Sequence, residues 1–174
     1  EFREPLLLCQ RSLHATGNGI IAHGRLTDVL RRMAAFGLTL VRLDVRQEAE
    51  RHTEAVDAIT RTLGLGEYRS WPEERRVDFL VNVLTHGRKL TPARMPTTPR
   101  VAEVLDTFRM MAAVHPESLG AYVITMAGKP SDVLAVELLQ REAGVTPPKR
   151  VVPLFETARN LRDAAGMNDK MMEI

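Results

Sequence analysis

The sequence predicts an α/β fold in which about three parallel strands are accompanied by many helices. The first observation is a strand-like stretch, Leu38–Glu48, with helical patterns on both sides of it. The second is that two later strand-like stretches, Ala121–Ala127 and Val151–Phe155, are separated by another helical pattern. Strands that alternate with helices favour a parallel sheet, and repeats of helix, tight turn and strand are typical of a β/α barrel. We therefore expect a helix-rich fragment of a (β/α)8 TIM-type barrel.

The first strand carries charges where a parallel sheet is normally apolar. Because side chains alternate along a strand, Arg42, Asp44 and Arg46 share one face of it. Burying such ions costs several kcal/mol each unless partners compensate. For Arg42 and Asp44 we favour a structural ion pair. Arg46 stands near the carboxyl end of the strand, where α/β folds place ligands, and its planar guanidinium suits a phosphate or carboxylate.

Helical spacing of apolar residues predicts the remaining elements. A Gly37 cap ends the second helix, Gly144 stops the sixth, and Ser131 is the expected N-cap of the sixth. Between Gly87 and Pro99 the chain reads as a surface loop. The predicted helices are Pro5–Leu13, Leu26–Met33, Ala49–Leu63, Glu73–Leu84, Val101–Met111, Ser131–Leu139 and Thr157–Ile174.

Composition places the chain among ordinary soluble globular proteins. Of its 174 residues, 44% are hydrophobic and 26% are charged, and the net charge is +2 with a pI near 9.0. This mild, evenly mixed charge does not favour nucleic acid or a membrane surface as a partner. No apolar run approaches the length of a membrane span, and no signal-peptide pattern opens the sequence. The single cysteine, Cys9, excludes an intrachain disulfide, so we expect a reducing, cytoplasmic location.

Several side chains that can bind metals or ligands receive no catalytic role. His52 follows Glu48 by four residues, but no second histidine stands at zinc-motif spacing, so a solvated or supporting role is favoured. Trp71 is interpreted as a packing residue, and Met110 and Met111 as core side chains that fill gaps. The other histidines lie in no recognisable constellation: His14, His23, His86 and His115.

The ends of the strands carry the most informative side chains. Arg46 lies near the end of the first strand and Glu156 follows the third, while the second offers only Thr125 and Met126. The carboxyl ends of barrel strands surround one opening, so these residues can converge. Spacing alone leaves a catalytic site and a structural salt bridge equally supported. Pro153 is awkward inside a strand because it removes a ladder donor.

Five blocks of the sequence, in this order, resemble the central part of phosphoenolpyruvate carboxylase. They cover nearly the whole chain, and several long colinear matches are much more specific than one short motif. The resemblance implies that 1–174 is a single segment of a much longer enzyme and that it is incomplete on both sides. The blocks are Phe36–Glu48 (FGLTLVRLDVRQE), Arg51–Glu54 (RHTE), Ala121–Ala127 (AYVITMA), Pro130–Val136 (PSDVLAV) and Val152–Thr157 (VPLFET).

The resemblance also implies a reaction and a set of site residues. Enzymes of this family condense phosphoenolpyruvate with bicarbonate, giving oxaloacetate for the tricarboxylic acid cycle and phosphate, with Mg²⁺ or Mn²⁺ as cofactor. Arg46 matches an arginine that contacts the substrate phosphate, and Leu154 matches an apolar residue near the substrate methylene. Glu156 matches one of two carboxylates that bind the divalent ion. The family histidine, the second carboxylate and an arginine-bearing glycine-rich loop lie outside these blocks.

The resemblance therefore implies that the full-length enzyme is active and forms a homotetramer. It also implies that the isolated segment is inactive. Two alternatives remain at this point. One is a different barrel enzyme that uses phosphoenolpyruvate, which would share a phosphate arginine and a metal carboxylate but not the long matching blocks. The other is a structural or assembly segment without catalytic residues, in which Arg46 and Glu156 need not point into a common cleft.

Overall fold

The computed structural model describes residues 2–87, 89–92 and 95–173. The chain divides into two compact units, Glu1–Arg42 and Leu43–Ile174. We call them the N-terminal and C-terminal units. Within the residues described, no helix is both long enough and apolar enough to cross a membrane.

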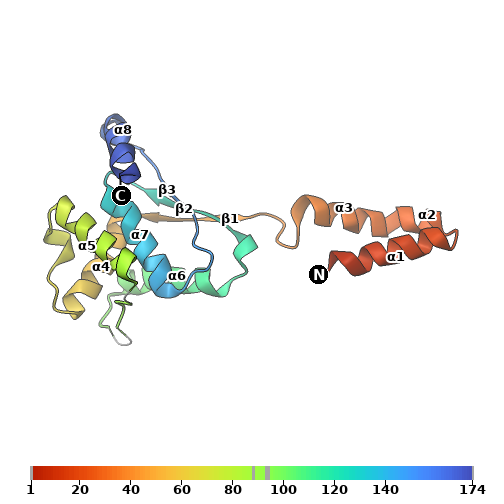
Figure 1. The fold of residues 1–174 in the computed structure, drawn as a ribbon, viewed down its shortest axis with the longest axis horizontal. Coiled ribbons are helices and arrows are strands. Elements are labelled where there is room, and N and C mark those ends of the chain that lie inside the picture. The colour runs from red at the N-terminus through yellow and green to blue at the C-terminus, as the bar shows by residue number, and fades with distance from the viewer. Residues whose placement is uncertain (1, 88, 93–94, 174) are drawn as a thin grey trace. The chain divides into compact units, whose positions relative to one another are not determined.

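The N-terminal unit is built from helices. It contains α1 (Arg3–Ala15), the short α2 (Gly19–Ile21), a π-helical turn (Ala22–Leu26) and α3 (Thr27–Phe36). Helices α1 and α3 lie side by side (Figure 1), and Gln10 of α1 donates a hydrogen bond to Oγ1 of Thr27 at 3.1 Å. Gly37, with a φ of 61°, ends α3, which agrees with the predicted glycine stop.

The first predicted strand is shorter than expected. The chain turns over residues 38–41, where Leu40 adopts a φ of 59°, and this conformation cannot belong to a strand. Strand β1 therefore begins at Leu43. It is also exposed rather than buried, because in the part of the chain described here it pairs with β2 alone and so forms an edge.

The C-terminal unit contains a sheet of three parallel strands in the order β1-β2-β3. This confirms the predicted α/β architecture with three parallel strands and many helices. Pro153 pairs with Ile124 on the edge strand β3, as expected for a proline that cannot donate to a ladder. The strands and α-helices are β1 (Leu43–Glu48), α4 (Ala49–Thr62), α5 (Glu73–His86), α6 (Pro99–Ala113), β2 (Leu119–Thr125), α7 (Pro130–Ala143), β3 (Val151–Pro153) and α8 (Ala158–Met172). Two 3₁₀ turns, Tyr68–Ser70 and Pro116–Ser118, precede α5 and β2.

The core of this unit lies between one face of the sheet and the helices (Figure 1). On β2, Tyr122 and Ile124 are fully buried, and the Tyr122 ring stacks on Phe108 of α6 with centroids 5.1 Å apart. We call this side the Tyr122 face. Since neighbouring side chains alternate, Val123 points the other way, and we call the opposite side the Arg46 face. Helices α4, α6 and α7 contact one another.

The expected roles of Ser131 and Met110 are wrong. Ser131 is not the N-cap of α7, because the helix already begins at Pro130 and Asp132 accepts hydrogen bonds from the main-chain N–H groups of Gly128 and Lys129. Met110 is exposed, while Met111 is buried as expected, because only the latter faces inward on α6. Trp71 is a buried packing residue, as predicted.

Candidate functional site

The parallel register brings the carboxyl ends of the three strands to one edge of the sheet. Glu48 at the end of β1 pairs with Thr125 at the end of β2. Beyond Pro153, the N–H of Leu154 still donates to the carbonyl of Ile124 at 2.8 Å, which keeps the end of β3 beside β2. The segments that follow all three strands therefore begin at the same edge.

Arg46 lies on the face of the sheet opposite the buried tyrosine. It pairs with Val123, which in turn pairs with Val152, and side chains in register on parallel strands point to the same side. The Arg46 side chain is exposed, and within residues 2–87, 89–92 and 95–173 its guanidinium forms no hydrogen bond or ion pair. An arginine with no protein partner is available to bind an anion.

Asp44 has a structural role that differs from the one expected. Its Oδ1 accepts a hydrogen bond from the main-chain N–H of Ala121 at 2.7 Å, where the register between β1 and β2 shifts. A Cβ at position 120 would lie too close to Oδ1 of Asp44, so a side chain there would displace this carboxylate from its bond to Ala121. The expected partner, Arg42, is exposed and is the last residue of the N-terminal unit.

Leu154 and Glu156 follow β3. Leu154 is half-buried, and because it lies two residues after Val152, strand alternation places it on the Arg46 face. Glu156 is exposed, and its carboxylate has no hydrogen-bond or ion-pair partner among the described residues. The salt bridge that would have explained Glu156 structurally is therefore not formed with any of them.

The donor chemistry of Glu156 fits one ligand of a hard divalent cation, which prefers carboxylate oxygens. No group of three or more His, Cys, Asp or Glu side chains that could hold a metal occurs among the residues described. Glu156 could thus supply one metal ligand, and further ligands would have to come from elsewhere.

The end of β2 has a feature that the sequence did not reveal. Met126 adopts a φ of 55°, which is rare for a residue other than glycine, and its side chain is exposed beside the strand ends. The next residue, Ala127, is fully buried, and its carbonyl accepts a hydrogen bond from Asn160 of α8 at 2.9 Å. Asn160 carries no signal in the sequence, because a polar residue in the first turn of a helix is common.

His52 is buried, so the expectation of a solvated side chain is wrong. It lies on α4 beneath the Tyr122 face, fully inaccessible, with Nε2 2.8 Å from the hydroxyl oxygen of Tyr122. Burial, helped by the charge of Arg51, lowers the pKa of His52 to about 3, so the imidazole is neutral at pH 7. It faces away from Arg46 and belongs to the core.

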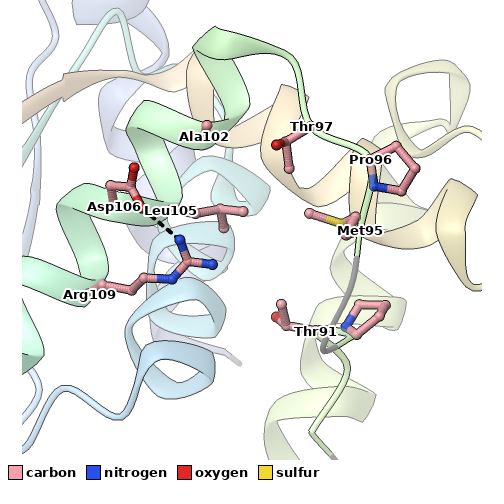
Figure 2. A pocket seen from close by; sticks show the side chains of 9 residues that line it. Thr91, Met95, Pro96, Thr97, Ala102, Leu105, Asp106 and Arg109 are labelled. Atoms are coloured by element: carbon pink, nitrogen blue, oxygen red, sulfur yellow. Dashed lines mark hydrogen bonds and ion pairs between the residues drawn. The ribbon is translucent and has the colours of Figure 1, made fainter.

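A pocket of about 510 Å³ lies elsewhere, between α6 and residues 91–92 and 95–97 (Figure 2). An ion pair between Asp106 and Arg109, 2.6 Å long, forms part of its wall. None of Arg46, Leu154 and Glu156 lines this pocket. The strand ends, and not this pocket, are the candidate functional site.

Comparison with known proteins gives the strand ends a family context. A family model described as phosphoenolpyruvate carboxylase matches residues 1–174. The chain is 53% identical over 171 residues to phosphoenolpyruvate carboxylase 2 of Sorghum bicolor, covering 98% of this chain and 18% of that protein. It is 54% identical over 171 residues to a phosphoenolpyruvate carboxylase of Pseudomonas paraeruginosa, covering 98% of this chain and 20% of that protein. It spans about a fifth of the length of these relatives. The chain therefore belongs to the phosphoenolpyruvate carboxylase family.

Proposed function

We propose that this chain is a segment of a phosphoenolpyruvate carboxylase and carries part of its active site. The complete enzyme would join phosphoenolpyruvate and bicarbonate to give oxaloacetate and phosphate, a carboxy-lyase activity that feeds the tricarboxylic acid cycle. The observation that carries this proposal is the placement of Arg46 and Glu156. Both lack a partner among the described residues, and both lie toward the carboxyl edge of one parallel sheet.

Each residue would have a distinct task. The Arg46 guanidinium, a rigid fork of N–H donors, would bind the substrate phosphate through two parallel hydrogen bonds. Leu154 would place an apolar wall against the substrate methylene. Glu156 would hold Mg²⁺ or Mn²⁺ through one carboxylate oxygen. The bound metal would stabilise negative charge that develops on substrate oxygens.

The arrangement of the sheet supports a (β/α)8 barrel as the complete fold. In such a barrel the helices form an outer ring and the strands turn their other face inward. Here the buried Tyr122 faces the helices, while the charged Arg46 points to the opposite side of the sheet. Among the described residues β1 pairs only with β2, so its other edge is open for pairing with a further strand. Cys9, an exposed free thiol, supports a reducing compartment such as the cytoplasm.

Steady-state kinetics of the full-length enzyme with Arg46→Ala test this proposal. Loss of the phosphate contact should raise the KM for phosphoenolpyruvate strongly. The matched control is Arg150→Ala, because Arg150 is an exposed arginine just before β3, at the opposite, amino edge of the sheet. Equal kinetics for the two variants would contradict the assigned role of Arg46.

A further inference from the structure

Asn160, in the first turn of α8, contacts both segments that leave the sheet beside Glu156. Its side-chain Nδ2 donates to the carbonyl of Ala127, after β2, at 2.9 Å. Its main-chain N–H donates to Oγ1 of Thr157, the residue that follows Glu156, at 3.0 Å. One residue, through its side chain and its main-chain N–H, thus joins the segment after β2 to the segment after β3.

These contacts fix the chain on both sides of Glu156. Before it, the N–H of Leu154 donates to the carbonyl of Ile124 at 2.8 Å. After it, Thr157 is tied through Asn160 to Ala127. Both attachments lead to the same stretch of chain, the end of β2 and the residues just after it. The main chain that carries the Glu156 carboxylate is therefore held relative to β2 from two directions.

The side chain of Asn160 is not needed to cap α8. Thr157 is the N-cap, and the group it accepts is the main-chain N–H of residue 160, which any residue except proline would supply. Among the described residues, the side-chain amide adds one hydrogen bond, to the carbonyl of Ala127. The fit there is close, since Ala127 is fully buried and a Cβ built on Gly128 would lie 3.4 Å from Oδ1 of Asn160.

We propose that Asn160 is a positioning residue for Glu156, holding its carboxylate at the edge of the sheet in the orientation that binds a divalent metal. This inference rests on the proposed metal role of Glu156. Groups that orient a metal ligand typically change metal affinity or activity by 10-fold to 100-fold when they are removed. Asn160 would act through the main chain of residues 156–160 without touching the metal.

The test measures Mn²⁺ binding to the full-length enzyme directly, from the electron paramagnetic resonance signal of free Mn²⁺. Asn160→Ala should raise the Kd for Mn²⁺ by about 10-fold. The control is Asn168→Ala, the same change at an exposed position of the same helix, which should leave the Kd unchanged. If Asn160→Ala does not fold, Thr157→Val breaks the other link and should raise the Kd similarly. Wild-type Mn²⁺ affinity in the folded variant would overturn the inference.

A double variant separates positioning from general destabilisation. If Asn160 acts through Glu156, Asn160→Ala should weaken Mn²⁺ binding in the wild-type background but add nothing to Glu156→Gln. Additive effects of the two changes would overturn the inference. If Glu156→Gln alone leaves Mn²⁺ binding unchanged, Glu156 is not a metal ligand, and this assignment in the proposed function is wrong. If Glu156→Gln weakens Mn²⁺ binding and Asn160→Ala does not, only the role of Asn160 is overturned.

Discussion

Nε2 of His52 lies 2.8 Å from the hydroxyl oxygen of Tyr122 and so joins α4 to β2 on the covered side of the sheet. The other ring nitrogen, Nδ1, is buried and has no partner among the described residues. Because burial lowers the pKa of this imidazole to about 3, the folded protein holds His52 in its neutral form. The sheet that carries Arg46 is thus packed on a histidine that resists protonation.

The first prediction concerns pH. The folded pKa of His52 lies below the value near 6.5 of an unfolded histidine, so the unfolded state binds more protons between these values. The stability from neutral His52 is present above pH 6.5 and is lost as the pH falls toward 3. Lowering the pH from 6.5 to 5 should remove about 2 kcal/mol. His52→Phe should abolish this part of the pH dependence.

Urea unfolding of both proteins at pH 6.5 and pH 5 checks this prediction. Asp132 and Glu137, whose pKa values burial raises, are present in both proteins, so their contributions cancel in the comparison. An equal loss of stability in the wild type and in His52→Phe would contradict the prediction.

The second prediction concerns Ser131. Its Oγ donates to Glu73 at 2.8 Å and its N–H donates to the same carboxylate at 2.9 Å, which ties α7 to the start of α5. Removing a buried hydroxyl that binds a charged group should lower the free energy of unfolding by about 1–3 kcal/mol in Ser131→Ala. Ser70→Ala is the control, because the Ser70 hydroxyl is exposed and, within the described residues, bonds only the carbonyl of Glu67. Equal urea midpoints for the two variants would be evidence against this role.

The sequence predicted the parallel strands and most helices, because their apolar patterns and glycine stops are local signals. It could not predict that Leu40 turns with a positive φ and delays β1 to Leu43. His52 and Ser131 were misjudged because their partners, Tyr122 and Glu73, lie 70 and 58 residues away along the chain. Contacts of this range leave no periodic trace in a sequence.

The candidate site could be predicted in part, because some of its residues are marked by local features of the sequence. Arg46 and Glu156 were identified from their positions at strand ends and from the family resemblance, both of which are visible in the sequence. The bond from Asn160 to Ala127 was not, because it depends on how α8 meets the turn after β2.

The third prediction compares two replacements of Arg46 in the full-length enzyme. Arg46→Ala should lose about 2–5 kcal/mol of transition-state binding, because the substrate phosphate is left without its charged partner. Arg46→Lys should recover only part, since an ammonium cannot form the two parallel bonds of a guanidinium. Values of kcat/KM for phosphoenolpyruvate measure both losses. Full recovery by lysine would show that only the charge of Arg46 matters.

The fourth prediction is that the isolated 174-residue chain binds divalent metal weakly and forms no oxaloacetate. Glu156 offers a single carboxylate, and the described residues contain no group of three potential metal ligands. A coupled assay for oxaloacetate with phosphoenolpyruvate, bicarbonate and Mn²⁺ tests this. Bicarbonate-dependent formation of oxaloacetate by the purified chain would contradict this prediction.

A manganese titration of Glu156→Gln in the full-length enzyme is the most direct test of whether Glu156 is a metal ligand of the active site. Glutamine keeps the shape of the side chain and removes its charge. If Glu156 binds the metal, the Mn²⁺ concentration giving half-maximal activity should rise at least about 10-fold, while the melting temperature without metal stays close to that of the wild type. An unchanged manganese requirement would contradict the account.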